Sequence, residues 1–348
     1  MKGGGFYDRY SGLQGAAAAA AWPVFERALE GRAPAPEGTF GLLDLGSSTG
    51  HNALGHMARI AEVLRRPLPA APIRATFSDL PTNDWSAFLK ELDEAAHQGH
   101  GSLAAARAAG IFPEIAIGSM YAGALLPRGA VQVTSCLIAI HWLSAAPDAS
   151  LGRAIDPLDS AAPREAREVW ATQSRVDLRN FLSARSEELS PGGVALILAP
   201  ARAMRDHFVT LFRQALVRAE ERGITPPQLL DRFAYPVCVR ALDEFVAAVE
   251  EGDLPLRVLA AEEISFELPT ARQLARGDLD GAIEIRAGGL RAVSEGLLNA
   301  TLASCDIAEP QPVIDAIFDQ VRVLAREEFA RPLPACAALA ITLERTAD

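Results

Sequence analysis

The stretch Phe40-Gly-Leu-Leu-Asp-Leu-Gly-Ser-Ser-Thr-Gly-His-Asn52 decides the fold of this chain. An apolar run leads to Asp44, Gly46 and Gly50 then lie on either side of a Ser-Ser-Thr cluster, and an amphipathic segment follows. This order predicts a buried strand, a tight turn and the start of a helix. Such turns lie at the carboxyl edge of a parallel sheet, where nucleotide-like ligands bind.

Strand and helix patterns alternate on both sides of this stretch. We expect further strands at residues 73–77, 111–118, 131–136, 194–199 and 337–343, and helices at 16–29, 53–65, 169–189 and 312–329. Alternation of this kind predicts a parallel sheet with right-handed crossovers. Helical periodicity dominates from residue 204 to 315, which predicts a helical insertion or cap. Residues 1–14 are rich in glycine, and by themselves they predict a frayed terminus.

Charge argues against two classes of partner. The chain has 348 residues, with 33 basic and 44 acidic side chains and a net charge of -11. A negative protein is repelled by phosphate backbones and by anionic membrane surfaces. We therefore expect neither nucleic acid nor a membrane as partner.

The four cysteines indicate a reducing compartment. They are scattered without a Cys-x-x-Cys pair or nearby histidines, so the sequence predicts neither a zinc site nor a disulfide framework. The first residues lack the apolar core of a signal peptide. We expect a cytoplasmic protein without a bound metal.

Two cofactor classes compete for the turn after Asp44. A dinucleotide site needs Gly-x-Gly-x-x-Gly to face a pyrophosphate, and the Ser47-Ser48-Thr49 cluster between the two glycines fits that pattern badly. S-adenosylmethionine (SAM) instead needs a carboxylate near its ammonium group, which Asp44 supplies. Asp79, which closes the second predicted strand, can accept both ribose hydroxyls. These residues favour SAM over a nicotinamide cofactor, and a site that binds neither stays open.

Several further blocks share one order with this turn. They are Met1-Lys2-Gly3-Gly4, Asp44-Leu-Gly-Ser-Ser-Thr-Gly50, Asp79-Leu-Pro-Thr-Asn-Asp84, Gly118-Ser-Met-Tyr121, His141-Trp-Leu-Ser144, Pro191-Gly-Gly193 and Arg291-Ala-Val-Ser-Glu295. In this order and spacing the chain resembles the SABATH methyltransferases, named for salicylate, benzoate and theobromine enzymes, from end to end. A single block such as D-L-G-x-x-x-G is weak, whereas the His-Trp-Leu-Ser and Asp-Leu-Pro-x-Asn-Asp blocks together are close to diagnostic.

The resemblance implies an α/β fold, a Rossmann-like SAM-dependent methyltransferase sheet with a helical cap. It implies three parts, namely an N-terminal segment (1–30) that closes over the active site, an α/β core (31–203 and 313–348) and a mainly helical cap (204–312) that forms the substrate pocket. Relatives commonly pair, so we expect a homodimer.

The resemblance also implies which residues bind each ligand. The residues expected around SAM are Tyr7, Ser11, Asp44, Gly46, Asn52, Asp79, Leu80, Ser119 and Met120. Those expected to bind a substrate carboxylate or lie beside it are Lys2, Gln14, Ile138, His141 and Trp142. Family members usually have an aromatic residue at the position of Met120, and plant members often have a tyrosine at that of Ile138, so adenine packing here would use a thioether and the acyl pocket should be more aliphatic.

Gln14 and Trp142 are the expected catalytic pair. Their amide and indole N–H groups donate, so they favour an ionised carboxylate and orient one oxygen toward the methyl group. Without the resemblance, Gln14 reads as a surface residue and Trp142 as a core aromatic. We interpret His141 as a structural histidine in preference to a general base, since a carboxylate nucleophile needs none.

The sequence thus predicts a SAM-dependent O-methyltransferase that converts the carboxylate of a small apolar acid to its methyl ester. The acid is benzoate- or salicylate-like, indoleacetate-like or fatty. The alternatives are an N-methyltransferase of the same family, a SAM-binding protein without catalysis and, more distantly, a nicotinamide-dependent enzyme.

Overall fold

The computed structural model describes residues 6–33, 38–67, 69–94 and 110–347. Within these residues seven strands form one sheet, and they are β1 (Phe40–Leu45), β2 (Ile73–Asp79), β3 (Ile111–Ile117), β4 (Val131–Leu137), β5 (Leu189–Pro200), β6 (Leu256–Phe266) and β7 (Cys336–Arg345). Their order across the sheet is β3-β2-β1-β4-β5-β7-β6. The predicted stretch around Asp44 is β1, whose six residues are all buried near the middle of the sheet.

The sheet is mixed, whereas the sequence predicted a parallel one. The pairs from β3 to β5 are parallel, but β7 runs antiparallel to both β5 and β6. Alternation of strands and helices carries no information about the direction of β7, because a long helical region precedes it. The expected α/β fold is otherwise confirmed.

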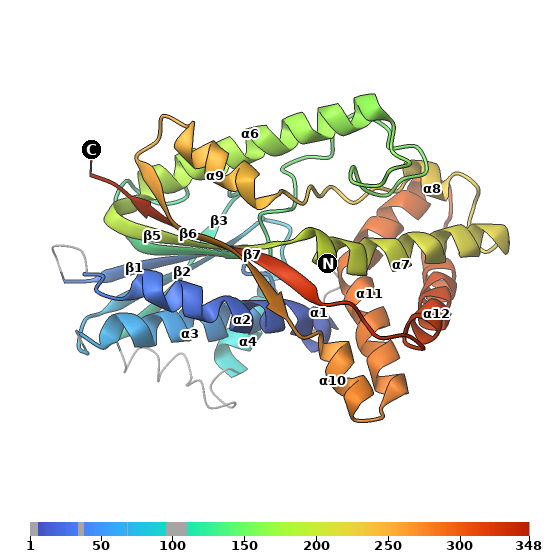
Figure 1. Cartoon of the computed structure of the whole chain (residues 1–348), viewed down its shortest axis with the longest axis horizontal. Helices are drawn as coiled ribbons and strands as arrows, with labels where there is room; N and C mark the ends of the chain where they lie inside the picture. Colours follow the sequence, from blue (N-terminus) through green and yellow to red (C-terminus); the bar gives the residue numbers. More distant parts are fainter. Residues whose placement is uncertain (1–5, 34–37, 68, 95–109, 348) are drawn as a thin grey trace.

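Helices cover both faces of the sheet (Figure 1). Helices α2 (Gly12–Leu29), α3 (His51–Arg65) and α4 (Trp85–Glu94) lie on one face, and α6 (Arg164–Glu188) and α9 (Leu242–Glu250) lie on the other. Successive side chains of a strand point to opposite faces. Leu42 accordingly packs in a cluster with Phe25 of α2, while Leu43 packs with Phe181 of α6 and Phe245 of α9.

A helical cap lies at one end of the sheet (Figure 1). It contains α7 (Arg202–Glu221), α8 (Leu229–Arg232), α10 (Pro269–Ala275), α11 (Leu279–Ser304) and α12 (Pro310–Glu328). Phe212, Phe233 and Phe318 are buried in its own apolar core. This core explains why the cap keeps one shape beside the sheet.

The segment 204–312 is not wholly cap, because it contains β6, which the sequence did not predict. β6 is an outer strand, pairs only with β7 among the described strands, and is partly exposed along most of its length. Its alanines and glutamates have low strand propensity, so the pairing with β7 must come from tertiary contacts. Helix α9 of the same segment covers the sheet. The division of the chain into three parts stays a prediction.

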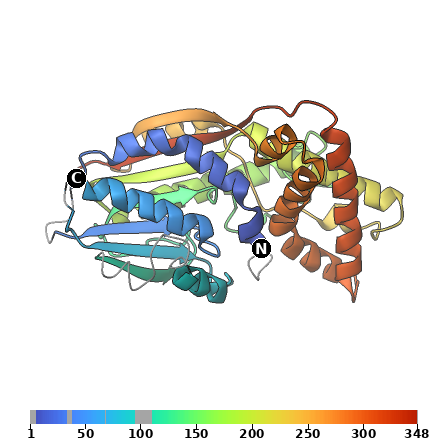
Figure 2. The same cartoon turned by 90° about the horizontal axis from the view of Figure 1, so that it is seen from below.

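The N-terminal residues are helical rather than frayed from residue 6 onward. A short helix, α1 (Phe6–Tyr10), precedes α2, which begins at Gly12 and so extends four residues before the predicted start. Pro23 lies inside α2 and not in its first turn. Figure 2 shows α1 between the sheet and the cap.

None of the described helices is both long and apolar enough to cross a membrane.

Candidate active site

Two adjoining cavities lie where α1 and α2 meet the sheet and the cap. The polar cavity spans about 470 Å³, a volume that includes space open to solvent, and is lined mainly by the turn between β1 and α3. The apolar cavity spans about 710 Å³, which also includes open space, and is lined by the residues after β4, by α7 and by residues 235–239. Tyr7 and Gln14 line both cavities, so the two spaces meet at these side chains.

Asp44 lines the polar cavity at the carboxyl end of β1. It is 3% exposed, and its two carboxylate oxygens accept hydrogen bonds from Ser47 Oγ at 2.8 Å and Ser135 Oγ at 2.7 Å. Burial raises its pKa to about 6, against the opposing effect of these two hydroxyls. A buried carboxylate with a raised pKa is stabilised in its charged form by a cation, and a cationic ligand group supplies one.

Asp79 fixes the turn of the polar cavity. Its carboxylate accepts hydrogen bonds from the backbone N–H groups of Ser48 and Leu80, each at 2.7 Å. Ser48 has a φ of 51°, in the left-handed region, and its carbonyl accepts a bond from Asn83 Nδ2 at 2.7 Å. The turn that follows β1 is therefore hydrogen-bonded to residues at and just after the end of β2. Burial raises the pKa of Asp79, although both backbone bonds oppose this.

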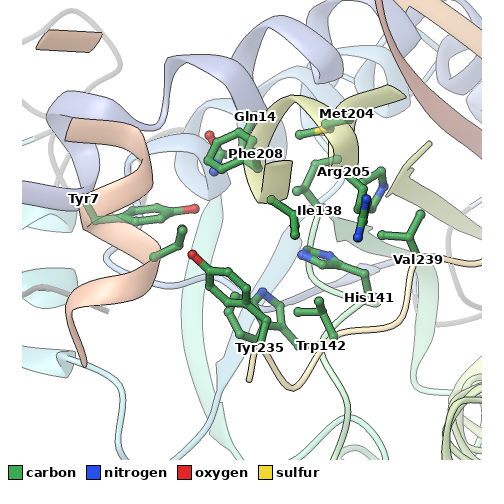
Figure 3. Close-up of a pocket in the computed structure, with 14 residues that line it drawn as sticks. Tyr7, Gln14, Ile138, His141, Trp142, Met204, Arg205, Phe208, Tyr235 and Val239 are labelled. Carbon is green, nitrogen blue, oxygen red and sulfur yellow. The ribbon is translucent and has the colours of Figure 1, made fainter. Parts of the chain in front are cut away.

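The apolar cavity has a mainly aliphatic wall with a few polar groups (Figure 3). Its apolar lining residues are Ile138, Pro200, Met204, Phe208, Val209, Val237, Val239 and Val293. Figure 3 shows Tyr7 on one side, facing Arg205 and His141 across the space, with Gln14 and Trp142 at opposite edges. Such a wall suits a small molecule with an apolar body and a polar end.

The loop that carries His141 and Trp142 is held by distant residues. Tyr121 Oη lies 2.8 Å from the carbonyl oxygen of Ile140 and 2.7 Å from that of Trp142. Arg240 donates from Nη1 to Ile140 O at 2.6 Å. Trp142 also forms an isolated antiparallel bridge with Val237. These contacts hold the backbone of the loop in place at the cavity wall.

Asp177 fixes the end of the same loop. Its carboxylate accepts bonds from the backbone N–H and the hydroxyl of Ser144, at 2.8 and 2.7 Å. Asp177 lies on α6 and is buried. Within the His-Trp-Leu-Ser block, Ser144 therefore anchors the loop to helix α6 through Asp177.

Ile138 has a strained backbone at the cavity wall. Its φ is 56°, which a β-branched residue rarely adopts, and its N–H donates to Leu198 O at 2.7 Å. Such a conformation costs about 1–3 kcal/mol and is concentrated at functional sites. The chain turns sharply here, which directs the next residues toward the cavity.

His141 is uncharged at neutral pH. Burial, and then the nearby charge of Arg240, lower its pKa to about 3. Its Nδ1 is buried and has no hydrogen-bond partner among the described residues. A base with so low a pKa contributes little near neutral pH, which agrees with the interpretation of His141 as a non-catalytic histidine.

Several lining residues were not predicted as site residues. Arg205 is one, and its guanidinium pairs with Asp156 through Nε at 2.6 Å and through Nη2, and with Asp206 through Nη1 at 2.6 Å. Tyr235 is another, and its hydroxyl bonds to Ser294 Oγ. The resemblance pointed to the cap (204–312) as the source of the substrate pocket, but it gave no sign of a charged wall.

The predicted site residues fall into three groups. Tyr7, Gln14, Asp44, Gly46, Asn52, Ile138, His141 and Trp142 line one or both cavities. Ser11, Asp79, Leu80, Ser119 and Met120 line neither, although Asp79 bonds to the turn and Ser11 Oγ donates to Asp8 O at 3.1 Å. Lys2 lies outside the described residues. Their ligand contacts stay predictions.

The polar groups that line the polar cavity suit SAM. A buried carboxylate, Asp44, faces a space that is also lined by hydroxyls and by Asn52. Gly46 and Gly50 have φ values of 81° and 101°, so the turn keeps its backbone close to the cavity without side chains. We find no group of three His, Cys, Asp or Glu able to hold a metal ion in the part of the chain that the structure describes.

Comparison with known proteins decides the family. The sequence model of the family described as SAM dependent carboxyl methyltransferase matches residues 2–346. The chain belongs to this family. The resemblance to the SABATH enzymes is thereby confirmed, and with it the methyl donor SAM and the activity class of a carboxyl methyltransferase.

Individual relatives agree with this result. The chain is similar to the jasmonate O-methyltransferase of Arabidopsis thaliana, with 26% identity over 349 residues that cover 88% of this chain and 86% of the relative. It is similar to gibberellic acid methyltransferase 1 of the same plant, with 29% identity over 60% of each chain. A solved structure of loganic acid methyltransferase with SAH superposes with a TM-score of 0.82 at 20% identity, covers 100% of this chain and 99% of the other, and shows the shared fold.

Proposed function

We propose that this methyltransferase esterifies a small acid with a mainly apolar body, and that Gln14 and Trp142 bind its carboxylate. The observation that carries the proposal is the position of Gln14, which lines both cavities. The methyl group has to cross between donor and acceptor at the place where the two spaces meet. A side chain at that junction contacts the reacting oxygen.

The amide of Gln14 suits this position. Its Oε1 is buried and accepts no hydrogen bond from any residue in the described part of the chain. An amide offers a donor to a carboxylate and an acceptor to a cationic group. Gln14 can therefore donate to the carboxylate of the acid through its NH₂. The indole N–H of Trp142, which has no acceptor function, adds a second donor from the opposite edge.

Arg205 is the rival anchor for the carboxylate, because it is a cation in the wall of the same cavity. Its charge is already compensated by Asp156 and Asp206, through contacts to Nε, Nη1 and Nη2. A carboxylate placed there would meet two other carboxylates, and like charges repel. The neutral donors Gln14 and Trp142 are therefore favoured.

Alignment and exclusion of water are the main contributions of the protein. When bound, SAM supplies the methyl group on its sulfonium sulfur. Asp44 neutralises the ammonium group of this ligand, and Asp79 with Asn52 binds its ribose and neighbouring groups. Ser11, Leu80, Ser119 and Met120 complete its surroundings. Holding oxygen, carbon and sulfur in line removes most of the entropic barrier.

No general base is needed, because a carboxylate is ionised at neutral pH. Tyr7 and His141 agree with this view. Burial raises the pKa of the Tyr7 phenol, so it stays protonated and acts as a donor, while His141 stays neutral. The wall beyond His141 is aliphatic, which favours benzoate-like, indoleacetate-like or medium-chain acids.

Incubation with methyl-labelled SAM and a panel of acids tests the proposal. We expect benzoate, salicylate, indoleacetate or octanoate to receive label that mild alkali releases as methanol, because methyl esters hydrolyse under those conditions. Alkali-stable label on amines or ring nitrogens would instead indicate an N-methyltransferase. SAM binding without turnover on any acid would indicate a binding protein.

We also propose a cytoplasmic homodimer. The cysteines within the described residues are free, which suits a reducing compartment. β3 is an outer strand that exposes Phe112, Ile115 and Ile117, and a second copy can cover such an edge. Light scattering at micromolar concentration tests the pairing, and a monomeric mass would reject it.

A further inference from the structure

The short helix α1 has contacts at both of its ends. On the sheet side, the Asp8 carboxylate accepts a hydrogen bond from Thr49 Oγ1, in the turn of the polar cavity. On the cap side, Tyr10 packs against α11 at Gly288. α1 therefore bridges the two parts of the molecule, and Figure 2 shows it lying between them.

Gly288 leaves a notch that the ring of Tyr10 fills. A Cβ atom built at Gly288 would lie 2.3 Å from both Cδ1 and Cε1 of Tyr10, a distance that real Cβ atoms do not show. Gly288 is buried in the interior of α11, a helix of 26 residues. Glycine is unfavourable inside a helix. Here its missing side chain has a clear use, because no other residue leaves room for the ring.

The neighbouring glycine lacks this role. A Cβ atom at Gly289 would lie 3.6 Å from the carbonyl oxygen of Tyr10 and 3.9 Å from Cζ of Phe208, which are ordinary contact distances. Both positions lie in the same helix, so replacing either glycine with alanine raises the helix propensity by the same amount. They differ in whether a methyl group displaces the ring of Tyr10.

We propose that Tyr10, seated in the notch at Gly288, is a positioning residue that holds Tyr7 and Gln14 at the junction of the two cavities. Tyr10 lies between these two residues in the chain, three residues after Tyr7 and four before Gln14. Tyr7 precedes it on α1 and Gln14 follows it in the first turn of α2. A displaced ring would therefore shift both lining residues together. The catalytic part of this inference rests on the proposed function of Gln14.

The test compares Gly288→Ala with Gly289→Ala in the full chain. Gly288→Ala should raise the dissociation constant of SAM in calorimetry, through the shift of Tyr7, and the KM for the acid, through the shift of Gln14, each by about tenfold. It should also speed tryptic cleavage after the exposed Arg9, identified by mass spectrometry. Gly289→Ala should stay within about twofold of the parent on all three measurements. Thermal melting shows that both variants fold.

A double-mutant cycle separates the loss of the Tyr10–Gly288 contact from an unrelated destabilisation of the protein. Tyr10→Ala alone should reproduce the effect of Gly288→Ala, and Gly288→Ala should add nothing in the Tyr10→Ala background. Equal behaviour of the two glycine variants, or additive effects in the cycle, would overturn the proposal. SAM affinity and cleavage after Arg9 do not depend on the acid, so a wrong choice of substrate class would leave this test readable.

Discussion

The polar and apolar cavities meet at Tyr7 and Gln14 but are built from different kinds of structure. The polar cavity is made by one turn of consecutive residues, from Asp44 to Ala53, with contributions from the N-terminal helices. The apolar cavity draws its wall from short pieces between residues 138 and 293. Local sequence therefore determines the first cavity, and the packing of the cap determines the second.

The two regions also differ in electrostatics. The polar cavity presents the carboxylate of Asp44, whose pKa is raised by burial and whose two oxygens accept hydrogen bonds from the neutral hydroxyls of Ser47 and Ser135. The apolar cavity contains Arg205, which is fully paired, and His141, which is neutral. The difference is consistent with the proposal that the first cavity takes the cationic end of SAM and the second binds the anion of the acid through neutral donors.

Removing both donors for the acid should have the largest effect. In the Gln14→Ala, Trp142→Phe double variant, each lost hydrogen bond to a charged group costs about 1.5–3 kcal/mol. We expect kcat/KM for the acid to fall by about 10²- to 10⁴-fold, with SAM affinity within about threefold in calorimetry. Val293→Ala, which changes the same wall without removing a donor, is the control. An equal loss of SAM affinity would contradict the separation of roles.

Asp44→Asn should act on the other cavity. The hydroxyl of Ser47 or Ser135 that faces the new NH₂ can rotate to accept from it, while the other still donates to the amide oxygen, so the turn should persist. We expect SAM binding to weaken by about 10- to 150-fold, the value of one charged hydrogen bond, as measured by calorimetry. Glu62→Gln removes an exposed carboxylate from the adjoining helix α3 and should leave affinity unchanged. Unaltered SAM binding in Asp44→Asn would remove this residue from the site.

The pH dependence of SAM binding should follow Asp44. Its pKa is raised to about 6, so the group binds a proton as pH falls through that value and loses its attraction for a cation. The dissociation constant of SAM should rise by about tenfold between pH 7 and pH 5, and Asp44→Asn should flatten the profile. The KM for the acid should not show a histidine titration in this range, because the pKa of His141 is about 3.

A smaller effect is expected at Ile138. Ile138→Ala removes part of the apolar wall and relaxes a strained position, so the cavity should accept wider acids. We expect the ratio of kcat/KM for 2-naphthoate over benzoate to rise by about three- to tenfold, within the range for a change of a few methyl groups in a pocket. A ratio that does not change would place the acid away from Ile138.

The sequence was most informative for features that are formed by residues close together in the chain. Asp44, the glycines of its turn and Asp79 follow directly from a strand, a turn and the next strand, and the structure joins them through Ser48. β6 and the antiparallel direction of β7 were missed, because their pairing depends on partners far along the chain. Helix α1 and the first turn of α2 were missed as well, since the glycines of residues 1–14 indicate weak helix propensity.

The apolar site was only partly predictable. Gln14 and Trp142 were found through family resemblance, since nothing in their local sequence marks a ligand. Arg205 and Tyr235 were missed, because they reach the wall through the packing of α7 and of an irregular segment. The anchor of the His141 loop, Arg240, acts on a carbonyl 100 residues away. Contacts at such separation leave no periodic pattern in the sequence.

A crystal structure with S-adenosylhomocysteine and an acid that the enzyme methylates tests the central claim most directly. We expect the product to lie against Asp44 in the polar cavity, and the carboxylate to lie within about 3 Å of Gln14 Nε2 and Trp142 Nε1. One of its oxygens should point at the sulfur across the junction. A carboxylate bound to Arg205, with Gln14 and Trp142 free of contact to it, would contradict the account.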